Sequence, residues 1–495
     1  MQGNTKFKGK KTVYNLKLPT GSRRLDPEQS KLPIVPREHH LGYYAMVAIL
    51  TAGAIASWAF VTGGSIGVLV PVKYGICAAF FGCVIAYGIH GYMAVVYTRW
   101  GTDASVIGRS VWGHRGIYVL ILGIGFPATY GWGSMPMIML GRSAATVADS
   151  AGAPGILGTW QLWSFGALAI GLLITYYGTT VIDKISMIAT PIIVILIVFI
   201  CVVLLREYGI YDSFNTSPGD IPVTRHNYMV AVEIALGVGV SWIFLLSAYT
   251  KPALSENASY TPSVLGNGVA WAICCIAPMI TSCMVDLSDP VEALAAIGGG
   301  YVIVWLVMLA FANFSSVMVN PYFLSCNLQS MFPKMKWKYC VLIQTIYAVA
   351  IIFPVFYDQF GVVISFIGLL EGPAGCIWAL DFFLNKRINL RHCYAKGEQK
   401  KKSAYWYWHG FSVPAWVGLI CGTAFGIWHY NPWTSDIKFE GLFDLFGAML
   451  PASFIGTAVY FILWLALQKD WRRKLDMRAT VDEFVAQKDD NAKYI

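Results

Sequence analysis

The chain has 495 residues, of which 56% are hydrophobic and only 13% are charged, and its mean hydropathy is +0.56. A soluble protein of this length would carry about 25% charged residues, so the composition excludes a soluble globular protein and indicates an all-α polytopic membrane protein. The net charge of +9 could suit a nucleic-acid partner, but the basic residues lie between apolar segments, and we expect no nucleic-acid binding.

Twelve apolar segments follow a polar, basic tail that covers residues 1–42 and lacks the apolar core of a secretory signal. Each segment is long enough for a helix of about 20 residues to cross the hydrocarbon layer. The predicted spans are 43–70, 74–97, 116–141, 159–178, 185–205, 229–250, 264–285, 298–328, 338–357, 361–385, 411–429 and 441–468.

Lysine and arginine are distributed unevenly over the segments between these spans. If the N-terminal tail is cytoplasmic, 31 of the 36 Lys and Arg residues lie on the cytoplasmic side, as the positive-inside rule requires. We therefore expect a multi-pass protein of the plasma membrane (the inner membrane in a bacterium) with both termini in the cytoplasm. Residues 206–228 would form an extracellular loop, and the basic loop 386–410 and the tail 469–495 would be cytoplasmic.

One short phrase occurs twice, in the first and the sixth span. Ser57-Trp58-Ala59-Phe60 and Ser241-Trp242-Ile243-Phe244 both lie in apolar runs that contain several glycines. Glycine-interrupted spans at matching places in two halves are the best sequence pointer to the binding site of a transporter. The alternative is a chance match, because Ser, Trp and Phe are all common in this chain.

Catalytic and metal-binding motifs are absent from the sequence. It contains no HExxH, GxSxG or GxxxxGK[ST] pattern, and its eleven cysteines show no CxxC spacing and are interpreted as packing residues. We therefore expect no enzyme activity and no metal beyond a transported Na⁺. His90 in the second span could carry a proton, but a hydrogen-bonded packing role is the preferred interpretation.

Intramembrane carboxylates are costly and are candidate functional sites. Glu371 is the most central of them, just before Gly372-Pro373 in the tenth span, and we select it as a proton site. The alternative interpretation is a water-exposed residue on the cytoplasmic pathway.

Polar and aromatic residues of the third and eighth spans complete a candidate small-molecule site. The third span contains Tyr130-Gly131-Trp132-Gly133-Ser134, and the eighth contains Asn313 within Phe311 to Ser316. Tryptophan faces bind flat rings by stacking, and Asn and Ser supply hydrogen-bond donors and acceptors. No Arg or Lys lies in the middle of these spans, so the pattern favours a planar, neutral heterocycle.

Five motifs resemble the nucleobase–cation symporter-1 family, which includes cytosine, purine, uracil, allantoin and hydantoin permeases. They are ASWAFVTGGSIG (56–67), RWGTDASVIGRSVWGHRG (99–116), the Gly-Trp-Gly phrase of the third span, NPYFLSCNLQSMFPK (320–334) and IGLLEGPAGCIWALDFFLNKR (367–387). The match covers nearly the whole chain. It differs at the end of the sixth span, where Ala248-Tyr249-Thr250-Lys251 replaces the family's Asp-Tyr/Phe-x-Arg.

The resemblance implies a fold of the LeuT type, an alternating-access mechanism and a set of site residues. The two inverted five-helix repeats would be 43–205 and 229–385, with two further helices in 411–468. The implied substrate-binding residues are Ser57, Trp58, Trp132, Ser241, Trp242 and Asn313, with Trp132 and either Trp242 or Trp58 holding the ring. The implied Na⁺ ligands are Ala52, Ala56, Ala312, Ser315 and Ser316.

The coupling ion stays open at this stage. If the eighth span is anchored on Pro321 and Asn327, Phe311 and Ala312 fall at the family's hydroxyl positions and the Na⁺ site is lost, so H⁺ and Na⁺ are both expected candidates. We expect a monomeric symporter that imports a nucleobase or a related planar heterocycle and uses no cofactor. The alternatives are a related carrier or facilitator for another small solute, such as a vitamin precursor, ureide or amine, and a substrate sensor that does not transport.

Overall fold

The computed structural model describes residues 33–34, 39–55, 57–153, 155–177, 179–219, 224–385 and 388–469, without the side chains of 57, 179–184, 186, 187 and 315. Most of these residues are helical. The two strands in the described part of the chain are short and antiparallel, β1 (Tyr430–Asn431) and β2 (Asp436–Ile437).

The first five predicted spans correspond to helices, and the first of them is broken. Its two parts, α1 (Tyr43–Ala54) and α2 (Ser57–Gly67), meet at an angle of 58°. The other helices of this half are α3 (Val72–His90), α4 (Tyr92–Trp100), α7 (Gly116–Leu120), the π-helix η3 (Ile121–Gly125), α8 (Phe126–Ser150), α9 (Trp160–Tyr177) and α10 (Thr179–Glu207). Short helices in the connections are α5 (Ala104–Ile107), α6 (Arg109–Trp112), η4 (Gly155–Gly158) and α11 (Ile210–Asn215).

The sixth span is broken as well, so the second half begins as the first does. Helix α12 (Arg225–Val240) is followed by a turn over residues 241–245 and by α13 (Leu246–Thr250). The seventh, eighth and ninth spans comprise α14 (Asn257–Pro262), the π-helix η5 (Ser263–Ala270), α15 (Trp271–Cys274), α16 (Ile276–Val285), η6 (Gly299–Tyr301), α18 (Val302–Met331), α19 (Trp337–Ile343), η7 (Gln344–Ile346) and α20 (Tyr347–Ile352).

The last three spans are α22 (Phe360–Leu384), α25 (Val413–His429) and α27 (Met449–Leu467), with the connecting helices α17 (Pro290–Ile297), α21 (Val355–Asp358), α23 (Leu390–Cys393), α24 (Gln399–Lys402), η8 (Ala404–Trp406) and α26 (Glu440–Phe446). Among the described residues, seven helices are long and apolar enough to cross a membrane, or eight if the bent α1–α2 pair is one span. The number of twelve spans therefore stays a prediction.

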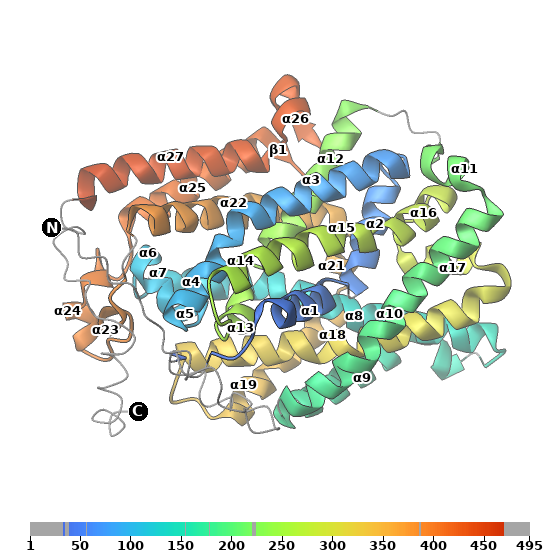
Figure 1. The fold of residues 1–495 in the computed structure, drawn as a ribbon, viewed down its shortest axis with the longest axis horizontal. Helices are drawn as coiled ribbons and strands as arrows, with labels where there is room; N and C mark the ends of the chain where they lie inside the picture. Colours follow the sequence, from blue (N-terminus) through green and yellow to red (C-terminus); the bar gives the residue numbers. More distant parts are fainter. Residues whose placement is uncertain are drawn as a thin grey trace.

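Glycines bring α25 and α27 into close contact along one edge of the molecule (Figure 1). A Cβ added to Gly422 would lie 2.6 Å from the carbonyl oxygen of Ala452, and one added to Gly418 would lie 2.6 Å from that of Gly456. Small residues of this kind let helix backbones approach closely where lipid gives no hydrophobic driving force. Helix α22 packs against both helices and connects them to α12 in the core.

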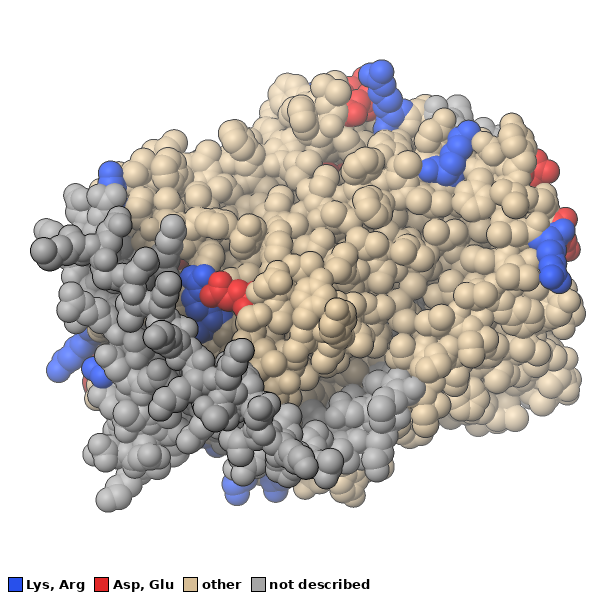
Figure 2. Space-filling model, viewed as in Figure 1, with Lys and Arg blue, Asp and Glu red and all other residues tan. Residues whose placement is uncertain are grey.

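Charged side chains are rare on the face drawn in Figure 2. Those that are visible lie toward the left and along the upper, right and lower edges, and the broad middle is covered by other residues. This is the distribution that a hydrocarbon layer requires of the surface it contacts.

Candidate functional site

The two broken spans meet at the centre of the molecule, and each contributes one tryptophan there. Trp58 lies in the first turn of α2, directly after the break that follows α1, and Trp242 lies in the turn between α12 and α13. Their ring centroids are 5.4 Å apart, with an interplanar angle of 68°. The repeated Ser-Trp phrase therefore marks the point where the two halves of the chain meet.

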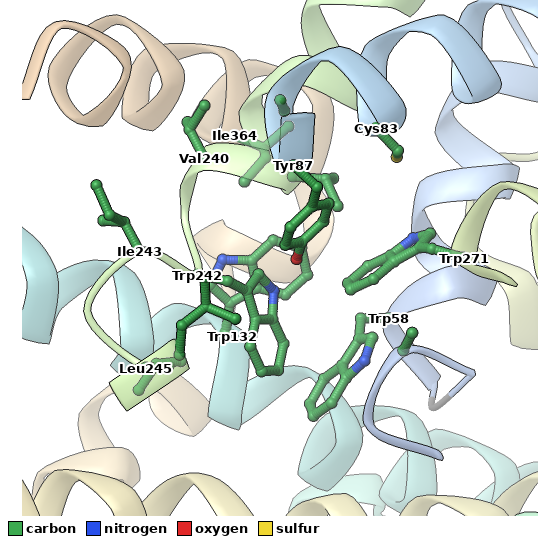
Figure 3. Packing of buried hydrophobic residues seen from close by; sticks show 14 of the residues in the cluster. Trp58, Cys83, Tyr87, Trp132, Val240, Trp242, Ile243, Leu245, Trp271 and Ile364 are labelled. Carbon is green, nitrogen blue, oxygen red and sulfur yellow. The ribbon is translucent and has the colours of Figure 1, made fainter. Parts of the chain in front are cut away.

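Two further tryptophans join them, and we call Trp58, Trp132, Trp242 and Trp271 the indole cluster (Figure 3). Trp132 comes from α8, and its centroid lies 6.3 Å from that of Trp58, 6.4 Å from that of Trp242 and 5.9 Å from that of Trp271. Trp271 is 6.1 Å from Trp242. All four side chains are at most 2% exposed.

The indole N–H groups of the cluster differ in their partners. Trp58 donates from Nε1 to the carbonyl oxygen of Gly53 at 2.9 Å, and this bond bridges the break between α1 and α2. The Nε1 atoms of Trp132, Trp242 and Trp271 are buried and have no hydrogen-bond partner. A buried donor without a partner costs about 1–3 kcal/mol, and the acceptors of a bound ligand could satisfy the three donors that lie together here.

The predicted polar residues are largely bonded to their own helices. Ser241 donates from Oγ to the carbonyl oxygen of Val238 at 2.9 Å, and Asn313 donates from Nδ2 to that of Leu309 at 2.9 Å. The side-chain oxygen of Asn313 is buried and has no partner, so it can accept a hydrogen bond. The side chain of Ser57 lies outside the described residues.

The predicted Na⁺ ligands are described only in part. Ala56 and the side chain of Ser315 lie outside the described residues, whereas Ala312 and Ser316 are buried in α18, which contacts α2. Ala52 is half-buried near the end of α1. The Na⁺ site stays a prediction.

Glu371 is fully buried, and neither of its carboxylate oxygens has a hydrogen-bond partner. The side chain is therefore not exposed to water in this structure, and its role as a proton site stays a prediction. Gly368 and Gly375, three residues before and four after it, pack against Gly237 of α12 and Ile243 of the turn that follows α12. Since these positions share one face of a helix, Glu371 faces the break in the sixth span.

His90 has the packing role that was preferred for it. Its Nδ1 lies 2.9 Å from the carbonyl oxygen of Ala86, and its ring fills the space beside Gly375.

Three ion pairs lie beyond the cluster, two in one direction along the third span and one in the other. Arg142, toward the end of α8, pairs with Asp289 and, at 2.5 Å, with Asp358 just before α22. Near the other end of the span, Lys251 follows α13 and pairs with Asp103 at 2.9 Å in the connection between the second and third spans. These ion pairs link the connections at each end of the helices that carry the cluster.

Sequence reasoning missed Trp271. It follows the π-helix η5 directly, and π-helical turns are frequent at functional sites. The available signal was Gly266-Asn267-Gly268 inside the seventh apolar run, another glycine-interrupted span.

The broken spans, the apolar surface and the buried aromatic site together define a multi-pass membrane transporter. Residues 34–449 match the family described as permease for cytosine/purines, uracil, thiamine and allantoin, and the chain belongs to this family of permeases. The expectation that it is a transporter and not an enzyme is thereby confirmed.

Similar proteins agree with this assignment. The hydantoin permease of Microbacterium maritypicum is 24% identical over 424 residues, which cover 79% of this chain and 81% of that protein. Mhp1 in its inward-facing conformation superimposes with a TM-score of 0.73 at 19% identity, over 91% of this chain and 97% of that one. Mhp1, a nucleobase-cation-symport-1 family transporter, in a closed conformation with bromovinylhydantoin bound gives 0.70 at 18% identity, over 90% and 98%. These matches confirm the predicted LeuT-type fold.

Proposed function

We propose that the protein is a symporter that imports a nucleobase or a related planar nitrogen heterocycle and holds the ring between Trp132 and Trp242. The observation that carries this proposal is the packing of Trp132, Trp242 and Trp271, whose buried indole N–H groups have no partner, where the two broken spans meet. A flat ring with edge carbonyl groups stacks on the indoles and accepts hydrogen bonds. The hydantoin permease and the Mhp1 complex support a ring of this class.

The chemistry of the cluster favours a neutral substrate. All its described members are indoles, and the neighbouring side chains of Tyr87 (Figure 3) and Ser241 offer hydroxyl groups. A carboxylate or phosphate in such surroundings would be a buried charge without a counter-ion, which is costly.

For the coupling ion we propose H⁺, carried by Glu371. A charged carboxylate without any partner is expensive inside a protein, and a proton removes that cost. Because Glu371 faces the break in the sixth span, a change of its charge acts on the segment that carries Trp242. Na⁺, bound by Ala52, Ala56, Ala312, Ser315 and Ser316, is the competing candidate.

Coupling in this scheme is a difference in affinity between two conformations. Substrate and ion together favour the conformation in which the turn between α12 and α13 closes over the ring, and each raises the affinity for the other by the same factor. The Arg142 and Lys251 ion pairs would then form and break in turn at the two ends of the pathway.

Uptake into proteoliposomes tests the substrate proposal. The purified protein is assayed with a radiolabelled panel of purines, pyrimidines, hydantoins and ureides. Trp132→Ala should abolish saturable uptake, whereas Trp305→Phe, at a buried tryptophan packed on Phe199 and Tyr301, should keep it. Full uptake by Trp132→Ala would remove this residue from the site, and binding without any uptake would indicate a sensor.

The ion is tested by imposing Na⁺ and H⁺ gradients separately. With a proton gradient alone the protein should concentrate substrate, and Glu371→Gln should equilibrate substrate without concentrating it. Concentration that needs Na⁺ and is unchanged in Glu371→Gln would instead support the Na⁺ ligands.

The setting of this activity is part of the proposal. We propose a monomer in the plasma membrane with both termini in the cytoplasm, supported by the distribution of Lys and Arg between the spans.

A further inference from the structure

The four indoles leave too little room for a stacked ring in their present arrangement. A ring between two parallel aromatic faces needs about 7 Å between their centroids, twice the contact distance of carbon atoms. Trp132 and Trp242 are 6.4 Å apart and tilted by 54°. One of them must move outward when substrate enters, and Trp242 is the one that lies in a turn rather than in a continuous helix.

The other two indoles stand nearly perpendicular to this pair. Trp271 makes interplanar angles of 81° with Trp132 and 76° with Trp242, and Trp58 makes angles of 88° and 68°. A ring that stacks on Trp132 or Trp242 therefore meets Trp58 and Trp271 with its edge. Edge-to-face contact is a favourable aromatic geometry, and it depends on the size and substituents of the substrate ring within the plane of that ring.

The two edge positions differ in how firmly they are held. Trp58 is fixed through its bond to Gly53 and supports the break in the first span. Trp271 lies directly after the eight-residue π-helix η5, which sets the direction in which its side chain leaves the seventh span. Figure 3 shows its ring directed toward the space between Trp58 and Tyr87, and the buried hydroxyl of Tyr87, which has no hydrogen-bond partner, lies beside that space.

We propose that Trp271 is the edge wall of the substrate site and determines how large a ring or ring substituent the transporter accepts. This inference rests on the function proposed above and adds a specificity residue to it. Hydrophobic walls of this kind discriminate by about 10- to 200-fold per group added or removed. Replacing the indole by a single six-membered ring should therefore widen the site in the plane of the substrate.

The test compares competitors that share one ring and carry hydrogen, methyl, ethyl or benzyl at successive edge positions. Inhibition constants against uptake of the best substrate are measured for the wild type, Trp271→Phe and Trp305→Phe, the second being a buried tryptophan outside the cluster. We define the penalty as the ratio of the inhibition constant of the substituted competitor to that of the unsubstituted one. In Trp271→Phe this penalty should fall at least tenfold at one edge position, and in Trp305→Phe it should stay within twofold of the wild-type value. Equal penalties in all three proteins would overturn the proposal.

Two controls separate the possible failures. If Trp271→Phe does not fold, Trp271→Tyr takes its place, because it keeps one aromatic ring and a polar edge. If Trp132→Ala retains saturable uptake, the proposed substrate site fails. If Trp132→Ala abolishes uptake while the Trp271 variants keep the wild-type penalties, only the role of Trp271 fails.

Discussion

The buried ion pair between Lys251 and Asp103 should be among the most sensitive contacts of the protein. The two side chains are 6% and 5% exposed, and Lys251 donates from Nζ to both carboxylate oxygens at 2.9 and 3.1 Å. Ser330 at the end of α18 donates to the same carboxylate at 2.8 Å. In Lys251→Met the carboxylate keeps this neutral donor but loses its counter-ion, so the free energy of unfolding should fall by about 3–5 kcal/mol.

A double-mutant cycle measures this contribution. Unfolding of the purified protein in detergent is followed for the wild type, Lys251→Met, Asp103→Asn and the double variant. Because the double variant leaves no unpaired charge, it should recover at least about 2 kcal/mol relative to the sum of the single losses. The control is Arg99→Met, which breaks an ion pair with Glu256 whose side chains are 34% and 47% exposed and should cost at most about 1 kcal/mol. The reasoning is refuted if Lys251→Met costs no more than Arg99→Met, or if the single losses simply add.

Three further predictions follow from other parts of the structure. Burial, together with the nearby Arg109, lowers the pKa of His114 to about 3, so below about pH 6.5 the imidazole binds a proton in the unfolded chain but not in the folded one. The free energy of unfolding should therefore fall by about 2 kcal/mol between pH 6.5 and 5. Unfolding measured at both pH values should show a smaller loss in His114→Gln. Gly422→Leu should lower the free energy of unfolding by about 1–3 kcal/mol, because the larger side chain pushes α25 away from α27. The control Gly166→Leu, at a position where an added Cβ has no atom within 4 Å, should leave thermal unfolding nearly unchanged. Arg142→Gln should lower stability less than Lys251→Met, because its partners are 12% and 42% exposed, and an equal loss in the same unfolding assay would contradict this ranking.

Much of the fold could be predicted because hydrocarbon imposes a long apolar run on each spanning helix. The repeated Ser-Trp phrase also predicted correctly that Trp58 and Trp242 lie together, since its glycines mark the helix breaks. The choice between Trp58 and Trp242 as the partner of Trp132 could not be made from the sequence, because it depends on ring orientation. The ring planes of Trp58 and Trp132 are 88° apart, and the N–H of Trp58 is used to bridge the first break. The planes of Trp242 and Trp132 are 54° apart, so Trp242 is the better candidate to stack with Trp132 on a substrate ring.

Contacts between distant segments were beyond sequence reasoning. The sixth span lacks the acid that the resembling family carries before its basic residue, which left Lys251 without an obvious partner in its own helix. The structure supplies that acid from Asp103, 148 residues earlier. Trp271 was missed for a related reason: its direction depends on the register of a π-helix, and helical periodicity does not predict where the register changes.

The two ends of the transport pathway are held by ion pairs of unequal burial, and this inequality bears on which end opens first. Asp358, which precedes α22, is 42% exposed, so water can replace its contact with Arg142 at little cost. Lys251 and Asp103 are almost fully buried, so separating them leaves two unpaired charges until water reaches both, and this raises the free-energy barrier to opening that end. The other partner of Arg142, Asp289, is 12% exposed, so in the proposed transport cycle it is the Asp358 contact that lowers the barrier at the Arg142 end. In the function proposed above, substrate binding between Trp132 and Trp242 would supply the free energy that opens the Lys251 end, because that segment continues directly from the turn that carries Trp242.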